Sequence, residues 1–211
     1  MRIASRFLGT CFIVLVLAAS ALAQRPAASL VRDRQLVLRP PAGAKVAIVV
    51  FEDLECPDCA RAHPIIQSVA AAQKVPVVRH DFPLPKHTYA FDAAVIGRYF
   101  DSKSPKLGAG WREYVFENQS AFTAQNLTEH AQRFAQANGT AMPFLLDPGG
   151  KFAARVRADF ALGQKIGIQH TPTIWVVGAT KAAHAAPFVE VVDRAQMSQM
   201  IDDMRKAAGG K

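Results

Sequence analysis

The stretch of sequence that decides the fold is Val46-Ala47-Ile48-Val49-Val50-Phe51-Glu52-Asp53-Leu54-Glu55-Cys56-Pro57-Asp58-Cys59. The continuous apolar run at 46–51 predicts a buried strand, and residues 60–74 predict the helix that follows it. Cys56 therefore lies at or next to the N-terminus of this helix, where unpaired N–H groups and the helix dipole favour an anion. Since the thiolate is the nucleophilic form of cysteine, we interpret Cys56 as the attacking thiol and Cys59 as the resolving thiol of a redox pair.

The number of cysteines supports this interpretation. The chain has three, and Cys11 lies apart from the pair, in the apolar N-terminal segment. A secreted domain held together by disulfides carries more cysteines, spread along the chain, and a zinc site needs two further ligands. The six histidines provide no second close ligand pair. A structural disulfide and a metal site are the alternatives, but the pattern favours redox chemistry with no metal and no cofactor beyond the Cys56–Cys59 disulfide.

Residues 1–23 have the features of a secretory signal peptide. Arg2 and Arg6 form the charged start, residues 7–19 the apolar core, and Ala21-Leu22-Ala23 the small-residue cleavage site. An uncleaved membrane anchor is the alternative, although the apolar core is short for a spanning helix. We therefore expect secretion across a membrane, into the periplasm or another extracytoplasmic space if the host is bacterial.

The chain is basic, with a formal net charge of +8 from 25 Lys and Arg against 17 Asp and Glu. A basic surface suits nucleic acid or an anionic membrane. However, the basic residues are scattered, without a run of four and without interleaved aromatic residues. We interpret them as a solvated surface and expect no nucleic-acid partner.

Outward from the cysteine pair, sheet elements are expected on both sides of a helical block. Residues 24–44 form a polar leader, in which 35–38 is expected to be a short edge strand. Further strands are expected at 75–82, 173–177 and 187–192, with a hairpin loop at 178–186 between the last two and a final helix at 194–208. The intervening block, 83–165, is helical throughout, with helices expected at 89–100, 110–117, 127–138 and 151–162.

Three motifs carry a resemblance to a known family. They are Phe51-x-Asp53-x-x-Cys56-Pro57-x-Cys59, Phe82-Pro83-Leu84-Pro85-x-His87 and Gly167-Ile168-x-x-Thr171-Pro172-Thr173. Together with the order of the elements, they resemble the DsbA-like thiol:disulfide oxidoreductases over 46–208. The resemblance implies an α/β, thioredoxin-like fold with a mixed central sheet flanked by helices. Residues 45–82 and 166–211 would form the thioredoxin-like domain, and 83–165 an inserted helical domain.

The resemblance also implies an active-site loop and a substrate groove. Thr171–Pro172 would be a cis peptide opposite Cys56, a geometry essentially confined to X-Pro bonds. Pro57 and Asp58 would complete the loop between the cysteines. In this family the cis-proline loop binds an extended peptide by strand addition. The alternative is that Pro172 is an ordinary proline at the start of a strand.

Substrate contacts are expected around this loop. Thr171 would present its backbone, and Leu54 and Phe82, with Leu84, would form an apolar rim. His170 would border the groove, or be an ordinary surface histidine. The implied partners are cysteine-containing secreted proteins and a membrane redox partner. Because the leader is too short for a dimerisation domain, we expect a monomer.

Two departures from the family concern the redox poise. Members often carry a buried acid six residues before the first cysteine, where this chain has Val50; Glu52 lies two residues further along the same face. The strongest oxidants have a histidine between the cysteines, whereas this chain has Asp58 there and Glu55 before Cys56. Negative charges disfavour a neighbouring anion. We therefore expect a Cys56 pKa in the upper part of the range of roughly 3.5 to 7.5 found at such sites, and a milder oxidant.

The sequence thus predicts an extracytoplasmic thiol:disulfide oxidoreductase that acts as an oxidase on secreted proteins. A reductase, or a thioredoxin-like electron carrier, uses the same residues in the opposite direction. A binding or chaperone module with an incidental dithiol is the third possibility. The direction of electron flow depends on the reduction potential and on the partner, which the sequence does not specify.

Overall fold

The computed structural model describes residues 27–179 and 188–209. The α-helices span Ala27–Val37 (α1), Pro57–Gln73 (α2), Ala90–Lys103 (α3), Pro105–Glu117 (α4), Leu127–Ala137 (α5), Lys151–Ile166 (α6) and Met197–Ala207 (α7). The strands span Val46–Glu52 (β1), Val77–Asp81 (β2), Thr173–Gly178 (β3) and Phe188–Glu190 (β4). Short 3-10 helices lie at Gln119–Ala121 (η1) and Arg194–Gln196 (η2).

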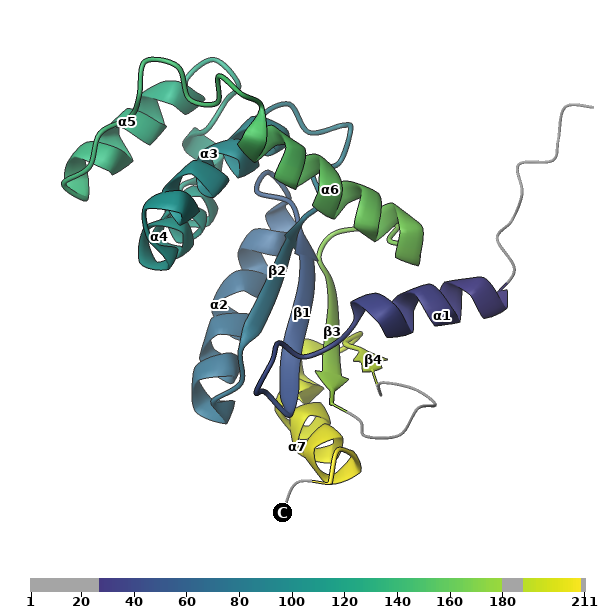
Figure 1. Ribbon diagram of the computed structural model, residues 1–211. Helices are drawn as coiled ribbons and strands as arrows, with labels where there is room; N and C mark the ends of the chain where they lie inside the picture. Colours follow the sequence, from purple (N-terminus) through teal and green to yellow (C-terminus); the bar gives the residue numbers. More distant parts are fainter. Residues whose placement is uncertain (1–26, 180–187, 210–211) are drawn as a thin grey trace, which may run out of the picture.

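A mixed sheet in the order β2-β1-β3-β4 forms the centre of the fold (Figure 1). β2 is parallel to β1, with Phe51 opposite His80. β3 is antiparallel to β1, with Phe51 opposite Thr173, and β4 is antiparallel to β3. The expected fold class, a thioredoxin-like mixed sheet flanked by helices, is confirmed.

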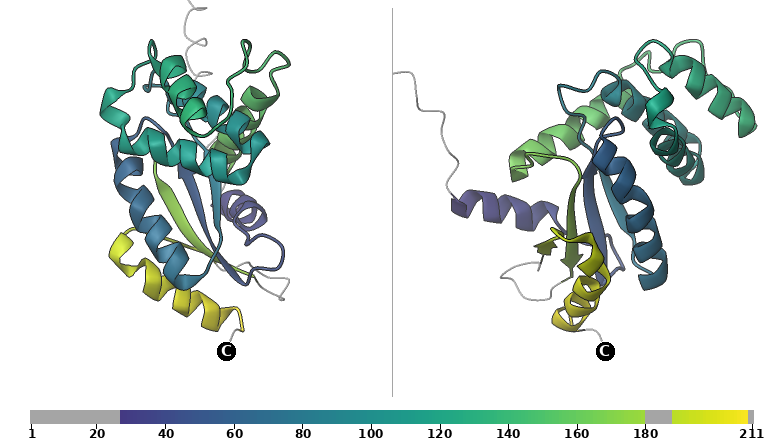
Figure 2. Two further views of the ribbon diagram at one scale, coloured as in Figure 1. Left: turned by 90° about the vertical axis from the view of Figure 1, so that its left-hand side faces the viewer. Right: turned by 180° about the vertical axis from the view of Figure 1, so that it is seen from behind.

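The two faces of β1 are buried under different helices (Figure 2). Val46, Ile48 and Val50 pack against apolar residues of α2 and α7. The alternate residues of β1 pack beneath α6 and the end of α1. Every residue of β1 is buried, as its continuous apolar run predicts for a strand covered on both faces.

The helices α3, α4 and α5 enclose a second core beside the sheet (Figure 1). Its centre is aromatic: the ring centroid of Phe100 lies 4.9 Å from that of Phe134 and 5.5 Å from that of Trp111. Trp111 also donates its indole N–H to the carbonyl of Ala93 at 2.9 Å, which satisfies its polar atom in the core. Because Cys56 and Cys59 belong to the same buried cluster, the helical block forms one wall of the redox site.

The leader differs from the sequence-based expectation. Residues 27–37 form α1, so the edge strand expected at 35–38 is wrong. Arg34 Nε donates to the carbonyl of Ile166 at the end of α6 at 2.9 Å, and Leu38 is fully buried beneath the sheet. These contacts with residues distant in sequence favour the helix where the local pattern is weak.

Two expectations lie outside the described residues. They are the signal peptide at 1–23 and most of the hairpin loop between the last two strands. Across 27–179 and 188–209, none of the helices has the length and apolar character needed to cross a membrane.

Candidate active site

Cys56 lies at the junction between β1 and α2. It is the N-cap residue of α2, with an extended backbone (φ −79°, ψ 119°), and its carbonyl accepts the first helical hydrogen bond, from Ala60 N at 3.1 Å. Pro57 occupies the first helical position, where no N–H is required. The local sequence thus places the sulfur over the free N–H groups of the first turn, as predicted.

The Cys56 sulfur faces the loop that leads into β3. Cys56 Sγ lies 3.3 Å from the carbonyl oxygen of Thr171, across 115 residues of sequence, and in its protonated form the thiol donates to this oxygen. The Thr171–Pro172 peptide is cis, as the resemblance implies. Only the tertiary fold brings these two loops together, because β1 and β3 are antiparallel neighbours.

The pKa of Cys56 is lowered to about 5. The largest cause is a hydrogen bond from the Cys59 thiol, which outweighs the effect of burial; the Thr171 side chain and the backbone N–H groups of Asp58 and Cys59 lower the pKa further. Each of these contacts stabilises the thiolate more than the thiol. Cys56 is therefore largely a thiolate at neutral pH.

Cys59 is the opposite kind of thiol. It is buried, and burial raises its pKa, as do the neighbouring Cys56 and Glu52. Its sulfur accepts a hydrogen bond from Asp53 N at 3.4 Å. The two sulfurs are not bonded to each other here, so the structure shows the dithiol form, with a reactive Cys56 and a protonated Cys59.

The two acids expected to oppose the thiolate are held by other groups. Asp58 pairs with Arg194, and with Arg61 at 3.2 Å. Glu55 Oε2 accepts the backbone N–H groups of Tyr89 at 2.6 Å and Ala90 at 3.1 Å, at the start of α3. The Cys56 pKa of about 5 lies below the upper part of the usual range, where it was expected. Both acids are paired with donors, and the main influences on the thiolate are the Cys59 thiol and the first turn of α2.

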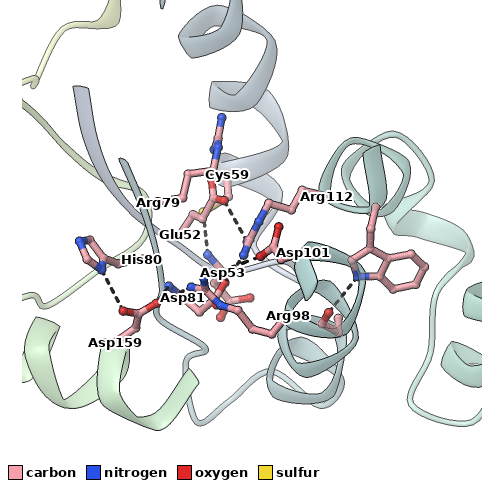
Figure 3. Close-up of polar contacts among 12 residues, drawn as sticks. Glu52, Asp53, Cys59, Arg79, His80, Asp81, Arg98, Asp101, Arg112 and Asp159 are labelled. Carbon is pink, nitrogen blue, oxygen red and sulfur yellow. Dashed lines mark hydrogen bonds and ion pairs between the residues drawn. The ribbon is translucent and has the colours of Figure 1, made fainter. Parts of the chain in front are cut away.

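Glu52 belongs to a buried network of charges beneath the cysteines (Figure 3). Its carboxylate pairs with Arg79 of β2 at 2.6 Å and with Arg112 of α4 at 3.2 Å. Arg112 continues to Asp81 at 2.8 Å, and Arg98 joins Asp81 to α6. The network thus ties β1 and β2 to the helical block, and it places Glu52 close enough to Cys59 to raise the thiol's pKa.

Asp53 is a second buried acid, which the motif contained but the sequence did not assign to the site. Its two oxygens accept N–H donors from Glu55 N at 2.7 Å, Leu84 N at 2.6 Å and His87 Nδ1 at 2.7 Å. Burial raises its pKa, and these donors partly offset the rise. Asp53 therefore fastens the loop after β2 to the cysteine turn.

The expected apolar rim is not present as predicted. Leu54 is 1% exposed and Phe82 is 4% exposed, and both pack into cores. Neither side chain is available to a substrate, so assigning them to substrate binding was wrong. Phe82 instead stacks on Phe160 of α6, whereas Leu84 is only partly buried.

The other predicted residues lie near Cys56. Thr171 is mostly buried beside the sulfur, whereas His170 is exposed at the entrance of β3. The His170 carbonyl accepts the hydroxyl of Thr173 at 2.6 Å. His170 is thus on the surface beside the site, and no contact of it with the cysteines is found in the described part of the chain.

Gln119 is a site residue that sequence reasoning missed. Its side-chain amide donates to the carbonyls of Leu54 at 2.9 Å and Cys56 at 3.1 Å. It lies in η1, just after α4, and connects the helical block directly to the cysteine turn. No local pattern marks this glutamine, because its partners lie more than 60 residues earlier.

Known proteins with a similar sequence or fold include thiol-disulfide exchange proteins. The sequence model of the thioredoxin family matches residues 41–203. The chain belongs to the thioredoxin family. Within it, the structure is similar to ScsC of Proteus mirabilis, with a TM-score of 0.65 and 16% identity, covering 87% of this chain and 82% of that one.

Two further structures have a similar fold. One is the thiol-disulfide exchange protein α-DsbA2 of Wolbachia pipientis, with a TM-score of 0.60 and 14% identity over 82% of this chain and 91% of that one. The other is a periplasmic thioredoxin-like protein of Salmonella enterica serovar Typhimurium, with a TM-score of 0.59 and 17% identity over 78% and 87%. These likenesses show that the chain shares the overall fold of these proteins.

One curated relative is also similar in sequence. The chain is 27% identical over 184 residues to the Na(+)/H(+) antiporter NhaA 3 of Salinispora tropica. The match includes 85% of this chain, which spans about a quarter (27%) of the length of that relative.

Proposed function

We propose that this thioredoxin-family protein is a thiol:disulfide oxidoreductase that works as an oxidase, exchanging its Cys56–Cys59 disulfide with cysteines of protein substrates. One observation carries the proposal: Cys56 Sγ, at the N-terminus of α2, faces the carbonyl of Thr171 at 3.3 Å beside the cis Pro172. A substrate peptide lying along this loop reaches a nucleophilic sulfur and the backbone of the cis-proline loop together. The likeness to a thiol-disulfide exchange protein supports the same chemistry.

In the oxidase reaction a substrate thiolate attacks Cys56 Sγ of the disulfide form. The Cys56–Cys59 bond breaks, Cys59 leaves and takes up a proton, and a mixed disulfide links Cys56 to the substrate. A second substrate thiolate then attacks the substrate sulfur of this mixed disulfide, and Cys56 leaves as a thiolate. The substrate loses two electrons and gains a disulfide, and the protein is reduced to the dithiol.

The low pKa of Cys56, about 5, favours this direction. A stable thiolate is a good leaving group, and it stabilises the reduced protein relative to the disulfide form. Among disulfide proteins, strong oxidants are those whose reduced form is stabilised in this way. A reductase or electron carrier is the second candidate, since it uses the same two sulfurs in the opposite sense.

The proposal also covers the compartment and the partners of the protein. We infer an extracytoplasmic protein that acts on cysteine-containing secreted proteins as a monomer and is reoxidised by a membrane redox partner. The N-terminal sequence features and the likeness to a periplasmic thioredoxin-like protein support this setting. Persistent disulfide formation requires such an oxidising compartment.

The test combines an activity with a potential. The oxidised protein is mixed with a reduced, unfolded protein that needs disulfides, and its own potential is measured in glutathione buffers. We expect disulfide transfer, its loss in Cys56→Ser, and an accumulated mixed disulfide in Cys59→Ser. The potential should lie well above the value of about −270 mV for thioredoxin.

Two results would redirect the assignment. A potential near that of thioredoxin, together with reduction of a disulfide substrate, identifies the reductase. Absence of thiol exchange in both directions, with the fold intact, leaves a binding module with an incidental dithiol.

A further inference from the structure

The buried Cys59 must lose a proton before it can act as the resolving thiol. In the mixed disulfide with a partner, the Cys59 sulfur attacks Cys56 only as a thiolate. Cys59 is 1% exposed, so bulk water does not reach the thiol freely. When Cys56 is in the mixed disulfide its negative charge is gone, which removes one of the causes that raise the pKa of Cys59. A nearby base is still needed to take the proton.

The two buried acids next to Cys59 are poorly suited to this role. Glu52 has an ion pair on each oxygen, with Arg79 and Arg112; although burial raises its pKa, these two cations lower it overall. Asp53 uses its oxygens to accept three N–H groups that fix the surrounding loops. Protonation of either carboxylate breaks contacts that hold the site together.

His63 is the remaining buried base, and it is unpaired. It is 5% exposed, yet neither Nδ1 nor Nε2 has a hydrogen-bond partner among the described residues. An unsatisfied polar group in a core is costly, and such groups call for an explanation. On its apolar side the ring lies against Phe116, at 5.0 Å between centroids. Packing therefore holds the imidazole in place without occupying its nitrogens.

The position of His63 relates it to Cys59. Both lie on α2, four residues apart and on its buried side. Residues at this spacing are neighbours, about 5–6 Å apart at Cβ, and helical side chains lean toward the N-terminal turn. This geometry favours a His63 ring that leans toward the turn that carries Cys59. This spacing allows proton transfer through one water molecule.

The charges around His63 suit a neutral base. Glu52 of β1 and Glu113 of α4 favour its protonated form, whereas Arg79 of β2 and Arg112 of α4 oppose it. Burial is the largest influence and lowers the pKa of His63. A free lone pair is therefore available at neutral pH, and Glu52, which also acts on Cys59, stabilises the imidazolium once it forms.

We propose that His63 is the base that accepts the Cys59 proton in the resolving step, with Glu52 stabilising the imidazolium. The S–H bond of Cys59 breaks and an N–H bond of His63 forms. The Cys59 thiolate then attacks Cys56, the Cys56–Cys59 bond forms, and the partner leaves as a thiolate carrying the electron pair. The imidazolium afterwards releases its proton to solvent. This inference rests on the proposed thiol–disulfide exchange.

The test separates the two halves of one exchange. Reduced protein is mixed with oxidised glutathione in a stopped-flow instrument. Attack by Cys56 gives a concentration-dependent phase, and resolution by Cys59 gives a concentration-independent one. In His63→Gln we expect the first phase to stay within about twofold, since Cys56 is unaffected. The second phase should slow by at least about tenfold at pH 7, since a positioned general base usually contributes more than this. Its rate should recover at high pH, where hydroxide replaces the base.

Two controls keep the outcome specific. His130→Gln removes another buried histidine, in α5, and should leave both phases unchanged. If His63→Gln does not fold, His63→Leu, which removes the unpaired nitrogens beside Phe116, carries the same test. Resolution within about twofold of the unsubstituted protein, or a deficit equal at every pH, would overturn the role of His63. Absence of the first phase in the unsubstituted protein would instead overturn the proposed function.

Discussion

The Cys56 thiolate is stabilised by contacts other than a histidine between the cysteines. The Cys59 thiol and the backbone N–H groups of the first turn of α2 lower its pKa to about 5. Asp58 stands in the variable position but does not oppose the thiolate, because Arg194 binds its carboxylate. Arg194, after β4, is thus part of the electrostatics of the redox site, although it lies 136 residues from Asp58.

Loss of Arg194 should raise the Cys56 pKa. In Arg194→Gln the negative charge of Asp58 is no longer compensated by Arg194, so it disfavours the neighbouring thiolate more strongly. An exposed ion pair contributes up to about 1 kcal/mol, so we expect a rise of up to ~0.7 pKa unit. The measurement is the pH dependence of Cys56 alkylation.

The matched control is the same substitution made in an Asp58→Asn background. There the Arg194→Gln effect should vanish, because no carboxylate is left to release. An equal shift in both backgrounds would mean that Arg194 acts only through its distant charge, without Asp58.

At the scale of single elements, the main contacts of the Glu55 side chain are with the start of α3. Its carboxylate accepts the N–H groups of Tyr89 and Ala90 at the first turn of that helix. A negative charge there is favoured by the helix dipole, and hydrogen bonds to a charged acceptor are strong. Glu55 therefore attaches the start of the helical block to the cysteine turn.

Glu55→Gln should weaken this attachment with little effect on Cys56. We expect the free energy of unfolding to fall by about 1 kcal/mol, since the charge is lost while a neutral acceptor remains. The readouts are a urea titration and the alkylation pKa of Cys56. A clear fall in the Cys56 pKa with unchanged stability would show that Glu55 acts on the thiolate after all.

The packing of α6 on the sheet depends on one small residue. A Cβ at Gly163 would lie 2.5 Å from Phe82 Cδ2 and 3.1 Å from Phe51 Cδ1. Only a glycine allows this close approach, which buries Phe82 in the core and away from the substrate side. The predicted apolar rim is absent for this reason.

Gly163→Ala should destabilise the protein by about 1–3 kcal/mol, the usual cost of overpacking a core. Gly110→Ala, also within a helix, is the matched control, because its Cβ would lie 3.5 Å from the nearest atom, in Phe134. It should be neutral or stabilise by up to about 1 kcal/mol through helix propensity. Equal effects of both substitutions in chemical denaturation would contradict the close packing of Phe82.

For the whole molecule, the thiolate couples redox state to stability. The native pKa of Cys56 is about 5, against ~8.5 in an unfolded chain. Between these values the unfolded dithiol protein binds one more proton than the native one, so native stability rises with pH. The disulfide form has no such group.

The stability difference between the two redox forms should therefore depend on pH. The free energy of unfolding of the dithiol form should rise relative to that of the disulfide form by about 1.4 kcal/mol per pH unit from roughly pH 6 to 7.5. Below pH 5 this contribution should be lost, because Cys56 is protonated in both states. Denaturant titrations of each form across this range are the measurement, and a constant difference would contradict the low Cys56 pKa.

The sequence by itself determined the features that depend on neighbouring residues. The apolar run of β1 predicted a strand buried on both faces, and the cysteine spacing placed Cys56 at the start of α2. The same holds for the main helices of the block, whose apolar periodicity is local. The motif around Thr171 and Pro172 implied the loop opposite Cys56, and the antiparallel pairing of β1 with β3 brings it there.

Only the tertiary structure decided which charges and side chains act on the cysteines. The local sequence shows that Asp58 and Glu55 lie beside Cys56, but not what pairs with them. In this fold Arg194 pairs with the Asp58 carboxylate, and the first turn of α3 donates to that of Glu55. Contacts with α6 likewise made 27–37 a helix and buried Phe82. The physical reason is that electrostatic and packing energies depend on distance in space, and the partners lie tens to more than a hundred residues apart. The sequence thus specified a redox pair, and its reactivity depends on the side chains that the fold brings around it.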